Sequence, residues 1–595
     1  MKKVKKEKDC KLKRDGFTCC SVGGKQHKNF VNKIFSLEID FFTEEKFDAG
    51  FLTGWCLYDS DGLFGAGDSV ESFISMLQCL VDFYKLEIYN NFSKDSILIY
   101  IDNPEKVYGF FLKYVTAEFM PHSCEICRFF EFRSYKTWQK ELDSAQKAAK
   151  VMQKFVDKLF VPEKYFYLTP NQRTRKLLAK ACKEEKSTVA KEAFPENPFA
   201  YMTLRSALFG GICYCPLPGV TKEKPILGLD INSAYIYSLL TQRFPVSKAK
   251  EEDPKNWEFY IKNEFEGSLG TYKITYTTAS TIVHCFKDLS GTNLSSGENV
   301  TVTLTLTDVD LAIILSLEKV YIKEVVCTYL EVYDLDYLPR YVVARLVEEY
   351  LKKSHIDKEK NPELYKLQKT ILNGIYGNCI KNISLEFFNK KKDSAYLTPQ
   401  WGIWTTSYTK QHLLGLALQM SGWLYSDTDS IYCYDTIQNR NLLKAYNEKT
   451  RKIMASFCER TGYIHPELLE LGEFEPEYEI KKFKALKQKE YLFTIEVEKE
   501  ITTEDGKTIK IKEDEIIVKA AGCSKEEMPL VDSLYRLKSL PVGTKIFSFI
   551  KDKPAKVEKD GKIYENESSY YELAFKGEKA KMMLTLLAKM EEGEI

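Results

Sequence analysis

The stretch Tyr425-Ser-Asp-Thr-Asp-Ser430 is the most informative part of this chain. Apolar residues flank it, Trp423-Leu424 before and Ile431-Tyr432 after, which predicts two short strands joined by a tight turn. Residues two apart on an extended chain face the same way, so we expect Asp427 and Asp429 to project together. Two carboxylates this close repel each other unless cations lie between them, which indicates a divalent-metal site. Polar β-turns and metal-dependent glycosyltransferases share the pattern, so it does not name a reaction by itself.

A second carboxylate follows another apolar segment. Pro225-Ile-Leu-Gly-Leu-Asp230 predicts a short buried strand, and Asn232-Ser-Ala-Tyr235 leads into a helix. The strand would bring Asp230 to the edge of a sheet, and the start of the helix offers backbone N–H groups to phosphate oxygens. Taken alone, an aspartate before a helix is most often an N-cap.

A third pattern lies on a predicted pair of helices, Pro339–Lys353 and Pro362–Tyr376, which form an αα-hairpin. On the second helix Lys369, Asn373 and Tyr376 are spaced i, i+4 and i+7, so they share one face. A lysine there would neutralise a triphosphate, and an amide and a ring would contact a base pair. Three apolar residues on the other face would seat the helix: Ile371, Leu372 and Ile375. Gly377 allows a close approach or caps the helix.

In this order the three patterns resemble motifs A, B and C of family B DNA polymerases, D-x-x-S-x-Y, K-x-x-x-N-x-x-Y-G and Y-x-D-T-D-S. The resemblance is greatest to the protein-primed branch of phages and linear plasmids. Phe209-Gly-Gly211 is similar to the family's Y-x-G-G link, although Leu208 stands in place of its tyrosine. Lys489-Glu-Tyr491 is similar to the K-x-Y motif, and Lys519-Ala-Ala-Gly522 follows it. The resemblance covers about residues 205–525.

The resemblance implies a role for each matching residue. Asp230 and Asp429 would bridge two Mg²⁺ ions, with Mn²⁺ as an alternative and Asp427 close by, for a two-metal nucleotidyl transfer. Tyr235 would exclude a ribose 2′-OH by collision and so select deoxynucleotides. The other implied nucleotide contacts are Lys369, Asn373, Tyr376 and Gly377. The implied primer and DNA contacts are Lys489, Tyr491, Lys519, Gly210, Gly211, Thr428 and Ser430.

The resemblance also implies the architecture, an α+β multidomain protein with a right-hand polymerase and an N-terminal RNase H-like α/β domain of the exonuclease type. We expect a basic tail (1–30), an exonuclease-like domain (31–200), a palm (201–250 and 381–519), an insertion similar to the terminal-protein region (251–337), two-helix fingers (338–380) and a thumb (520–595). A second insertion usual in this branch has only Asn378–Leu397 available, which is too short for the usual hairpin arm. Strand displacement and processivity are therefore in doubt.

The exonuclease motifs are poorly matched. The family needs D-x-E, then an asparagine followed by an aspartate, then Y-x-x-x-D. Asp40 matches the first aspartate but Phe42 replaces the glutamate, Asn103 is followed by Tyr108 in place of an aspartate, and Asp143 lacks the preceding tyrosine. We therefore expect a degenerate exonuclease domain without 3′–5′ proofreading. A different alignment would let Glu38 or Glu44 supply the missing ligand.

Composition restricts what kind of protein this chain is. The net charge is +1, so a nucleic acid would need a local basic groove rather than a basic protein. The scattered cysteines, Cys124 and Cys127 included, indicate a reduced cytoplasmic setting rather than disulfides or a clear zinc site. The sequence has no apolar run long enough for a membrane span.

The expected partners are a DNA primer-template and deoxynucleoside triphosphates. Priming by a terminal protein, by a nucleic acid or by a residue of this chain stays open. Two alternative functions also remain. One is a reverse transcriptase or RNA-synthesising polymerase, against which Tyr235 argues. The other is a catalytically silent DNA-binding protein of polymerase descent, which would be expected to have lost the three aspartates.

Overall fold

The computed structural model describes residues 17–18, 29–42, 51–86, 88–89, 92–93, 95–103, 130–138, 142, 144–158, 170–215, 222, 224–261, 263–278, 300–317, 320–384, 387–487, 489–502, 508–520, 545–549, 555–559, 562–566 and 570–574. The chain separates into two compact units. One comprises 1–185 and 344–375, and the other comprises 186–343 and 376–595.

The first unit is built on a six-stranded sheet with the order β1-β8-β7-β2-β3-β4. β2 pairs in parallel with β7, and β7 with β8, whereas the other neighbours are antiparallel. The strands are β1 (Phe17–Thr18), β2 (Asn29–Phe42), β3 (Phe51–Asp59), β4 (Gly62–Gly67), β7 (Asp95–Ile101) and β8 (Phe130–Ser134); β5 (Ile88–Tyr89) and β6 (Phe92–Ser93) pair separately. Apolar runs of the sequence near residues 34–42, 51–57 and 97–101 predict an α/β domain, and in the structure they form the neighbouring strands β2, β3 and β7.

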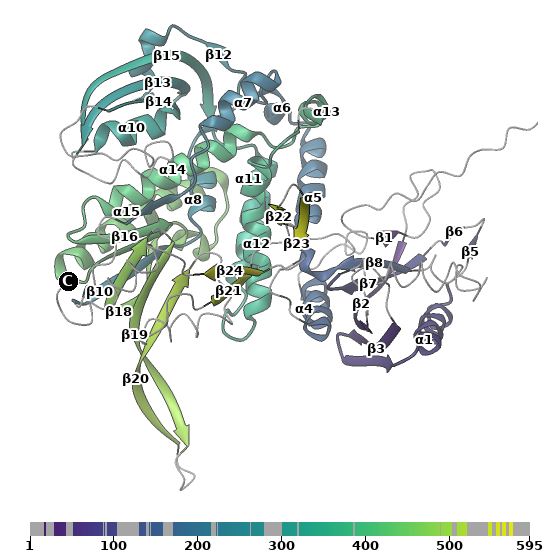
Figure 1. The fold of residues 1–595 in the computed structure, drawn as a ribbon. Helices are drawn as coiled ribbons and strands as arrows, with labels where there is room; N and C mark the ends of the chain where they lie inside the picture. The colour runs from purple at the N-terminus through teal and green to yellow at the C-terminus, as the bar shows by residue number, and fades with distance from the viewer. Residues whose placement is uncertain are drawn as a thin grey trace, which may run out of the picture. The chain divides into compact units, whose positions relative to one another are not determined.

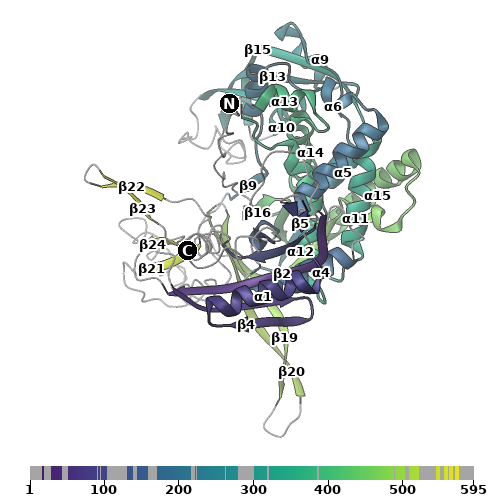
Figure 2. The same ribbon diagram turned by 90° about the vertical axis from the view of Figure 1, so that its right-hand side faces the viewer.

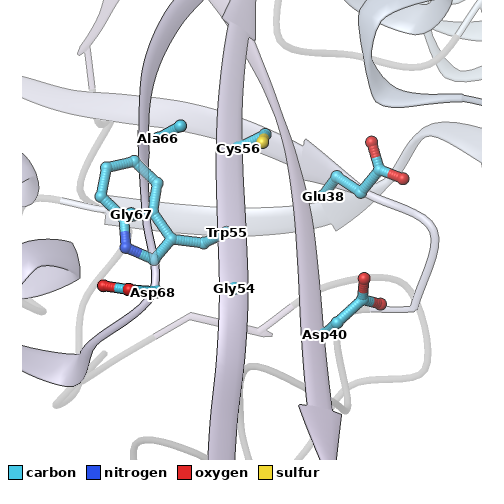
Figure 3. Close-up of a pocket in the computed structure, with 8 residues that line it drawn as sticks. All are labelled: Glu38, Asp40, Gly54, Trp55, Cys56, Ala66, Gly67 and Asp68. Atoms are coloured by element: carbon cyan, nitrogen blue, oxygen red, sulfur yellow. The ribbon is translucent and has the colours of Figure 1, made fainter.

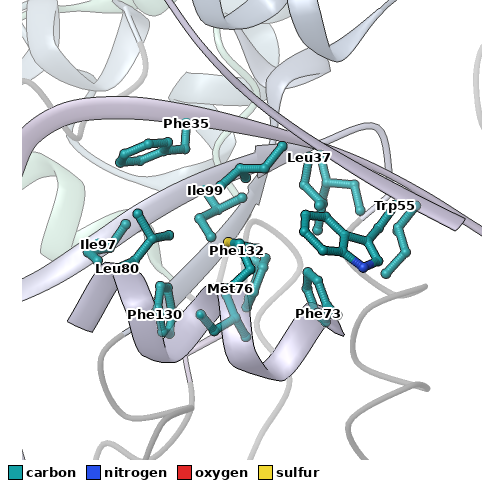
Figure 4. Close-up of a cluster of buried hydrophobic side chains, with 14 of the residues drawn as sticks. Phe35, Leu37, Trp55, Phe73, Met76, Leu80, Ile97, Ile99, Phe130 and Phe132 are labelled. Atoms are coloured by element: carbon teal, nitrogen blue, oxygen red, sulfur yellow. The ribbon is translucent and has the colours of Figure 1, made fainter. Parts of the chain in front are cut away.

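Helix α1 (Val70–Phe83) covers one face of this sheet (Figure 2). Ser69 caps it, because its hydroxyl accepts from the backbone N–H of Ser72. Alternate residues of β2 point toward α1 and are buried with its apolar side chains, as Figure 4 shows. The labelled members of this cluster are Phe35, Leu37, Trp55, Phe73, Met76, Leu80, Ile97, Ile99, Phe130 and Phe132.

A second cluster involves the intervening residues of the sheet and helix α4 (Ala145–Lys158). The apolar residues of segment 136–160 have helical spacing, which predicts one helix over the whole segment, but this prediction is wrong at its start. Residues 135–137 form a 3-10 turn, and Trp138 and Leu142 are buried before the helix begins at Ala145. The sequence also predicts a helix near residues 172–186, and this prediction is confirmed as α5 (Pro170–Glu185). Three residues of α12 (Pro362–Cys379) join the same cluster: Leu364, Leu367 and Ile371.

The second unit is built on a seven-stranded antiparallel sheet with the order β20-β19-β18-β10-β17-β16-β9 (Figure 1). Its strands are β9 (Ile212–Tyr214), β10 (Ile226–Ile231), β16 (Trp423–Thr428), β17 (Ser430–Tyr434), β18 (Phe474–Lys487), β19 (Glu490–Thr502) and β20 (Thr508–Ala520). The associated helices are α8 (Ala234–Thr241), α14 (Pro399–Ala417) and α15 (Ile437–Thr461). The predicted strand–turn–strand at 422–434 is confirmed. β10 lies at the centre of the sheet, between β17 and β18.

A second sheet of this unit contains the region predicted as an insertion. Its order is β11-β15-β13-β14, with β12 also on β15. The strands are β11 (Phe244–Pro245), β12 (Lys250–Glu251), β13 (Glu266–Thr278), β14 (Val300–Thr307) and β15 (Val320–Asp336). Helix α10 (Asp308–Ser316) follows β14 and packs on α14. The small helices are α6 (Val189–Glu192), α7 (Pro198–Ser206), α9 (Trp257–Tyr260) and α13 (Phe388–Asp393), with 3-10 turns at Pro254–Asn256 and Pro466–Glu470.

The predicted helix pair is confirmed as α11 (Arg340–Ser354) and α12. The predicted thumb, 520–595, lies largely outside the described residues. Its described strands pair as β21 (Lys545–Phe549) with β24 (Tyr570–Ala574), and β22 (Ala555–Lys559) with β23 (Lys562–Asn566). Most of the predicted tail, 1–30, also lies outside them. Among the helices described, none is long and apolar enough to cross a membrane.

Candidate active site

The register of the seven-stranded sheet brings the predicted aspartates into one row. Asp230 on β10 is paired directly with Ser430 on β17, and Ser430 is paired with Asp427 on β16. The row continues to Cys213 on β9 and, on the other side, to Glu475 on β18. Directly paired residues point to the same face of a sheet. Since neighbouring strands lie about 4.8 Å apart, the backbones of Asp230 and Asp427 are roughly 10 Å apart.

The turn between β16 and β17 places Asp429 beside this row. The N–H of Asp429 donates to the carbonyl of Asp427 at 2.7 Å, and Thr428 between them has a φ of +64°. A hydrogen bond across three residues with a positive central φ describes the rarer and more strained form of γ-turn. Asp427 and Asp429 therefore flank a turn rather than an extended segment, which corrects the geometry expected from the sequence.

The two hydroxyl residues predicted to contact DNA hold this turn in place. Thr428 Oγ1 donates to Asp427 Oδ1 at 3.1 Å. Ser430 Oγ accepts from the N–H of Asp427 at 3.3 Å and donates to its carbonyl at 3.2 Å. Both hydroxyls thus fix the orientation of Asp427, whatever contacts a substrate adds.

Gly211 allows the Phe209-Gly-Gly211 link to pass directly against the turn. A Cβ at Gly211 would lie 2.6 Å from Thr428 Cγ2 and 2.7 Å from Thr428 Cα, whereas a Cβ at Gly210 would meet no atom within 4 Å. A glycine is therefore required at 211, where the backbone passes close to Thr428, but not at 210. β9 then pairs with β16, so the link also sets the edge of the seven-stranded sheet.

Tyr235, on the first turn of α8, stacks on Tyr376 of α12 with ring centroids 4.2 Å apart and an angle of 21°. Burial raises the pKa of Tyr235 to about 12, and the negative charges of Asp429 and Asp427 add to the shift. The hydroxyl of Tyr235 is thus protonated at neutral pH. The N-cap of α8 is Ser233, in left-handed conformation, so Asp230 is not an N-cap but a strand residue.

The predicted motif-B residues lie together on α12. Lys369 is exposed and Asn373 is half-buried, as expected for a functional face. The seating residues on the opposite face are confirmed as buried: Ile371, Leu372 and Ile375. Gly377 lies inside the helix rather than at its cap, and a Cβ there would meet no atom within 4 Å. The space beside Gly377 is therefore open to a ligand.

The K-x-Y segment is tied to motif C through hydrogen bonds. Lys489 has a φ of +62°, is exposed, and its backbone N–H donates to the Tyr425 hydroxyl at 2.8 Å. Tyr491 is buried in an aromatic cluster, and its hydroxyl accepts from Tyr432 at 3.2 Å. Lys519 is paired with Tyr491 across β19 and β20. Tyr491 is thus a core residue that supports the Lys489 turn.

Glu475 is a candidate that sequence reasoning missed. It is opposite Asp230 in the row of carboxylates, and its Oε1 accepts from Asn232 Nδ2 at 2.9 Å. Glu473, two residues before Glu475, forms an ion pair of 2.7 Å with Arg451, and its backbone carbonyl accepts a hydrogen bond from the N–H of Asn232. From the sequence alone, the acidic run 473–479 indicates only a solvated face or one wall of a charged channel. The signal lay in its alternation, which points every second side chain to one face.

The carboxylates near the turn suit a metal ion whose coordination shell is completed by the substrate. Among the described residues, no three acidic, histidine or cysteine side chains converge closely enough to enclose a metal ion. Mg²⁺ usually takes only one or two protein carboxylates and completes its shell with water and substrate phosphates. Asp230, Asp427 and Asp429 can supply such carboxylates from one edge of the sheet. The expected pair of Mg²⁺ ions is therefore compatible with these residues.

The N-terminal unit contains a separate acidic pocket of about 640 Å³ (Figure 3). Glu38 and Asp40 extend from the same side of β2 into it, and Cys56 and Asp68 also line it. Glu38, two residues before Asp40, is thus the carboxylate that accompanies it. Asn103 is exposed at the end of β7, and Asp143 lies outside the described residues, as do Cys124 and Cys127. Among the described cysteines, none is joined to another by a disulfide bond.

Comparisons with known proteins relate part of this chain to a polymerase family. Residues 148–392 match the sequence model of DNA polymerase type B, organellar and viral. Over these residues the chain is similar in sequence to family B DNA polymerases. The matched segment contains Gly211, Asp230, Tyr235 and the motif-B helix, while Asp427 and Asp429 lie beyond it. No curated protein is similar enough in sequence to count as a relative.

At the level of the fold, the chain resembles several solved structures. It is similar to phi29 DNA polymerase complexed with primer-template DNA, at 14% identity and a TM-score of 0.58, over 91% of this chain and 100% of that one. The complexes of phi29 DNA polymerase with single-stranded DNA, and with primer-template DNA and incoming nucleotides, give TM-scores of 0.56 and 0.54, each at 14% identity over 89% of this chain and 98% of that one. The predicted mixed α+β multidomain fold is confirmed.

Proposed function

We propose that this chain extends a primer 3′ hydroxyl, or a protein hydroxyl, with deoxynucleotides by two-metal nucleotidyl transfer at Asp230, Asp427 and Asp429. The observation that carries the proposal is the register Asp230–Ser430–Asp427, which aligns carboxylates from strands about 200 residues apart in sequence. A catalytically silent descendant would have no reason to keep the strained turn at Thr428, since such strain is retained where function needs it.

Two Mg²⁺ ions bound to these carboxylates would lower the pKa of the primer hydroxyl and neutralise the triphosphate. The chain's own residues supply the positions. Thr428 and Ser430 orient Asp427, and the N-terminus of α8 presents backbone N–H groups toward phosphate oxygens.

Sugar selection is assigned to Tyr235. Its ring is stacked on Tyr376 and is therefore restrained, and a restrained ring excludes an extra hydroxyl more effectively than a mobile one. We propose that Lys369 binds the triphosphate, that Asn373 contacts the nascent base pair, and that Lys489 holds the primer end. These roles follow the family's motifs, and the exposure of Lys369 and Lys489 suits them.

The test is a gel assay with a 5′-labelled primer on a longer DNA template, with Mg²⁺ and dNTPs. We expect template-dependent lengthening that is lost in Asp427→Asn and kept in Asp514→Asn, a matched carboxylate on β20 that binds Lys481. Equal extension by both variants would refute the assignment of Asp427. No extension by the unmodified chain on a plain DNA primer, but extension on a protein primer, would establish terminal-protein priming. Extension only with ribonucleotides or an RNA template would favour the other polymerase classes.

For the N-terminal unit we propose a domain without 3′–5′ proofreading, because Tyr108 and Phe42 replace two carboxylates of the family's motifs. The pocket lined by Glu38 and Asp40 favours a second candidate, a nuclease with a rearranged first motif. Incubating the labelled primer with Mg²⁺ and no dNTPs decides between them. No shortening supports loss of proofreading, whereas shortening that disappears in Glu38→Gln/Asp40→Asn supports the second candidate.

A further inference from the structure

A fully buried ion pair joins the insertion to the palm. Asp310 Oδ1 on α10 lies 2.8 Å from Lys410 Nζ on α14, and the two side chains are 0% and 1% exposed. Lysine is almost never fully buried unless paired, because removing both charges from water is costly. A pair retained in such a place needs further contacts to compensate, and these contacts indicate what the pair does.

The carboxylate of Asp310 is fixed from its own side by a short relay. Ser407 Oγ donates to Asp310 Oδ2 at 2.9 Å, and Thr307 Oγ1 donates to Ser407 Oγ at 3.0 Å. Thr307 is the N-cap of α10, and its Oγ1 accepts from the N–H of Asp310 at 3.1 Å. Asp310 is therefore held by α10 and α14 together, and it presents a fixed anion to Lys410.

The ammonium of Lys410 also faces the link that precedes the catalytic sheet. Its Nζ lies 5.4 Å from the ring centroid of Phe209, within the range of a cation–π contact, and Phe209 is itself buried. Two residues later, Gly211 passes against Thr428, and β9 pairs with β16 so that Cys213 is opposite Asp427. Contacts thus run without a break from Asp310 to the catalytic turn.

We propose that Lys410 is a positioning residue for the polymerase reaction: anchored by Asp310, it holds the ring of Phe209 and thereby seats β9 and the Gly211 contact against the strand that carries Asp427. The proposal rests on the proposed function. The insertion is then connected to the active site through Lys410, and its helix α10 helps to set the position of a catalytic carboxylate.

A merely structural ion pair and a positioning cation predict different results when both charges are removed. Replacing a buried pair by uncharged residues of similar volume is often neutral for stability, whereas removing one partner leaves an unpaired buried charge. The double variant Asp310→Asn/Lys410→Met is therefore expected to fold. It keeps an acceptor for Ser407 but has no cation to face Phe209.

The experiment measures single-turnover nucleotide incorporation and the Mg²⁺ concentration for half-maximal rate, with the thermal midpoint of each variant. In the double variant we expect the midpoint to stay near that of the unmodified chain, the rate to fall about tenfold, and the half-maximal Mg²⁺ concentration to rise, because a lost cation–π contact in a dry site is of that size. Lys410→Arg, which keeps the cation, should recover most of the rate.

Asp308→Asn is the matched control. Asp308 lies two residues before Asp310 on the same helix and is also buried, but it accepts from Trp404 Nε1 at 3.0 Å instead. We expect its rate and Mg²⁺ dependence to be unchanged. Phe209→Leu tests the same link from its other end without touching the ion pair, and it should reproduce the loss of rate.

A double variant or a Phe209→Leu variant with unchanged rate and Mg²⁺ dependence would overturn the proposal and leave the pair purely structural. If the double variant does not fold, Phe209→Leu alone decides between the two outcomes. Failure of the underlying function would look different, since the unmodified chain would then show no template-dependent extension at all.

Discussion

Replacing Gly211 by alanine puts a methyl carbon 2.6 Å from Thr428 Cγ2 and 2.7 Å from Thr428 Cα. Ordinary carbon contacts are about 3.5–4.0 Å, so the new group overlaps by roughly 1 Å. The nearest backbone atom belongs to the catalytic turn and cannot rotate away as a side chain would. Thr428 already has a φ of +64°, so the turn has little freedom to give way. Overpacking of this kind costs about 1–3 kcal/mol.

If that strain displaces Asp427 in the transition state, the rate of incorporation falls by about 5- to 150-fold, at tenfold for each 1.36 kcal/mol. Gly210→Ala is the matched control, because a Cβ there meets no atom within 4 Å and neither glycine has a positive φ. Both changes reduce the freedom of the unfolded chain alike. The assay is single-turnover extension of a DNA primer at saturating dNTP. Equal rates for Gly211→Ala and Gly210→Ala would refute the claim that this contact sets the catalytic turn.

Three further predictions concern other parts of the site. Tyr235→Ala should lower discrimination against ribonucleotides by at least about tenfold, whereas Tyr235→Phe, which keeps the stacked ring, should leave it unchanged. Competition between dNTP and rNTP on one template measures this discrimination. Loss of discrimination in both variants would contradict a role of the ring. Glu475→Gln should raise the Mg²⁺ concentration for half-maximal rate about tenfold. Glu479→Gln, on the same strand but in contact with Arg440, should leave that concentration unchanged. Identical Mg²⁺ titration curves for the two variants would refute a role of Glu475 in metal binding. Burial raises the pKa of Asp308 to about 7, above that of an unfolded carboxyl, so its stabilising effect is complete below about pH 4 and is lost as the pH rises through about 7. Calorimetry from pH 5 to 8 should therefore show Asp308→Asn gaining in thermal midpoint relative to the unmodified chain, and a constant difference would show that Asp308 does not titrate there.

Much of the fold near the site could be predicted because its elements have strong local patterns. The run Ile226–Leu229 is apolar and short, and α12 has its apolar residues at helical spacing. The helix predicted from residue 136 shows the limit of such patterns. Trp138 and Leu142 fit helical spacing and are buried, yet α4 begins only at Ala145. Apolar residues can be buried in an irregular segment as well as in a helix. Periodicity alone therefore gives the wrong start for this helix.

The partners of the catalytic residues could not be predicted, because they depend on strand register. Glu475 is opposite Asp230 only because β18 joins β10 with an irregularity between Gly228 and Leu229. A shift of one residue would point Glu475 to the other face. The ion pair of Asp310 and Lys410 could not be predicted for a different reason: it depends on how α10 packs on α14, and the two residues are far apart in sequence.

Tyr425 shows how a motif residue can act through another motif. It is the first residue of Tyr425-Ser-Asp-Thr-Asp-Ser430 and is fully buried, so it cannot touch a substrate directly. Its hydroxyl instead accepts the backbone N–H of Lys489, whose φ of +62° is unfavourable for a lysine. Because a strained turn persists only when its surroundings hold it, this hydrogen bond helps to keep Lys489 in place. One buried tyrosine thus links the two motifs. Tyr425 precedes Asp427 and Asp429 on the chain, and its hydroxyl holds the backbone of Lys489.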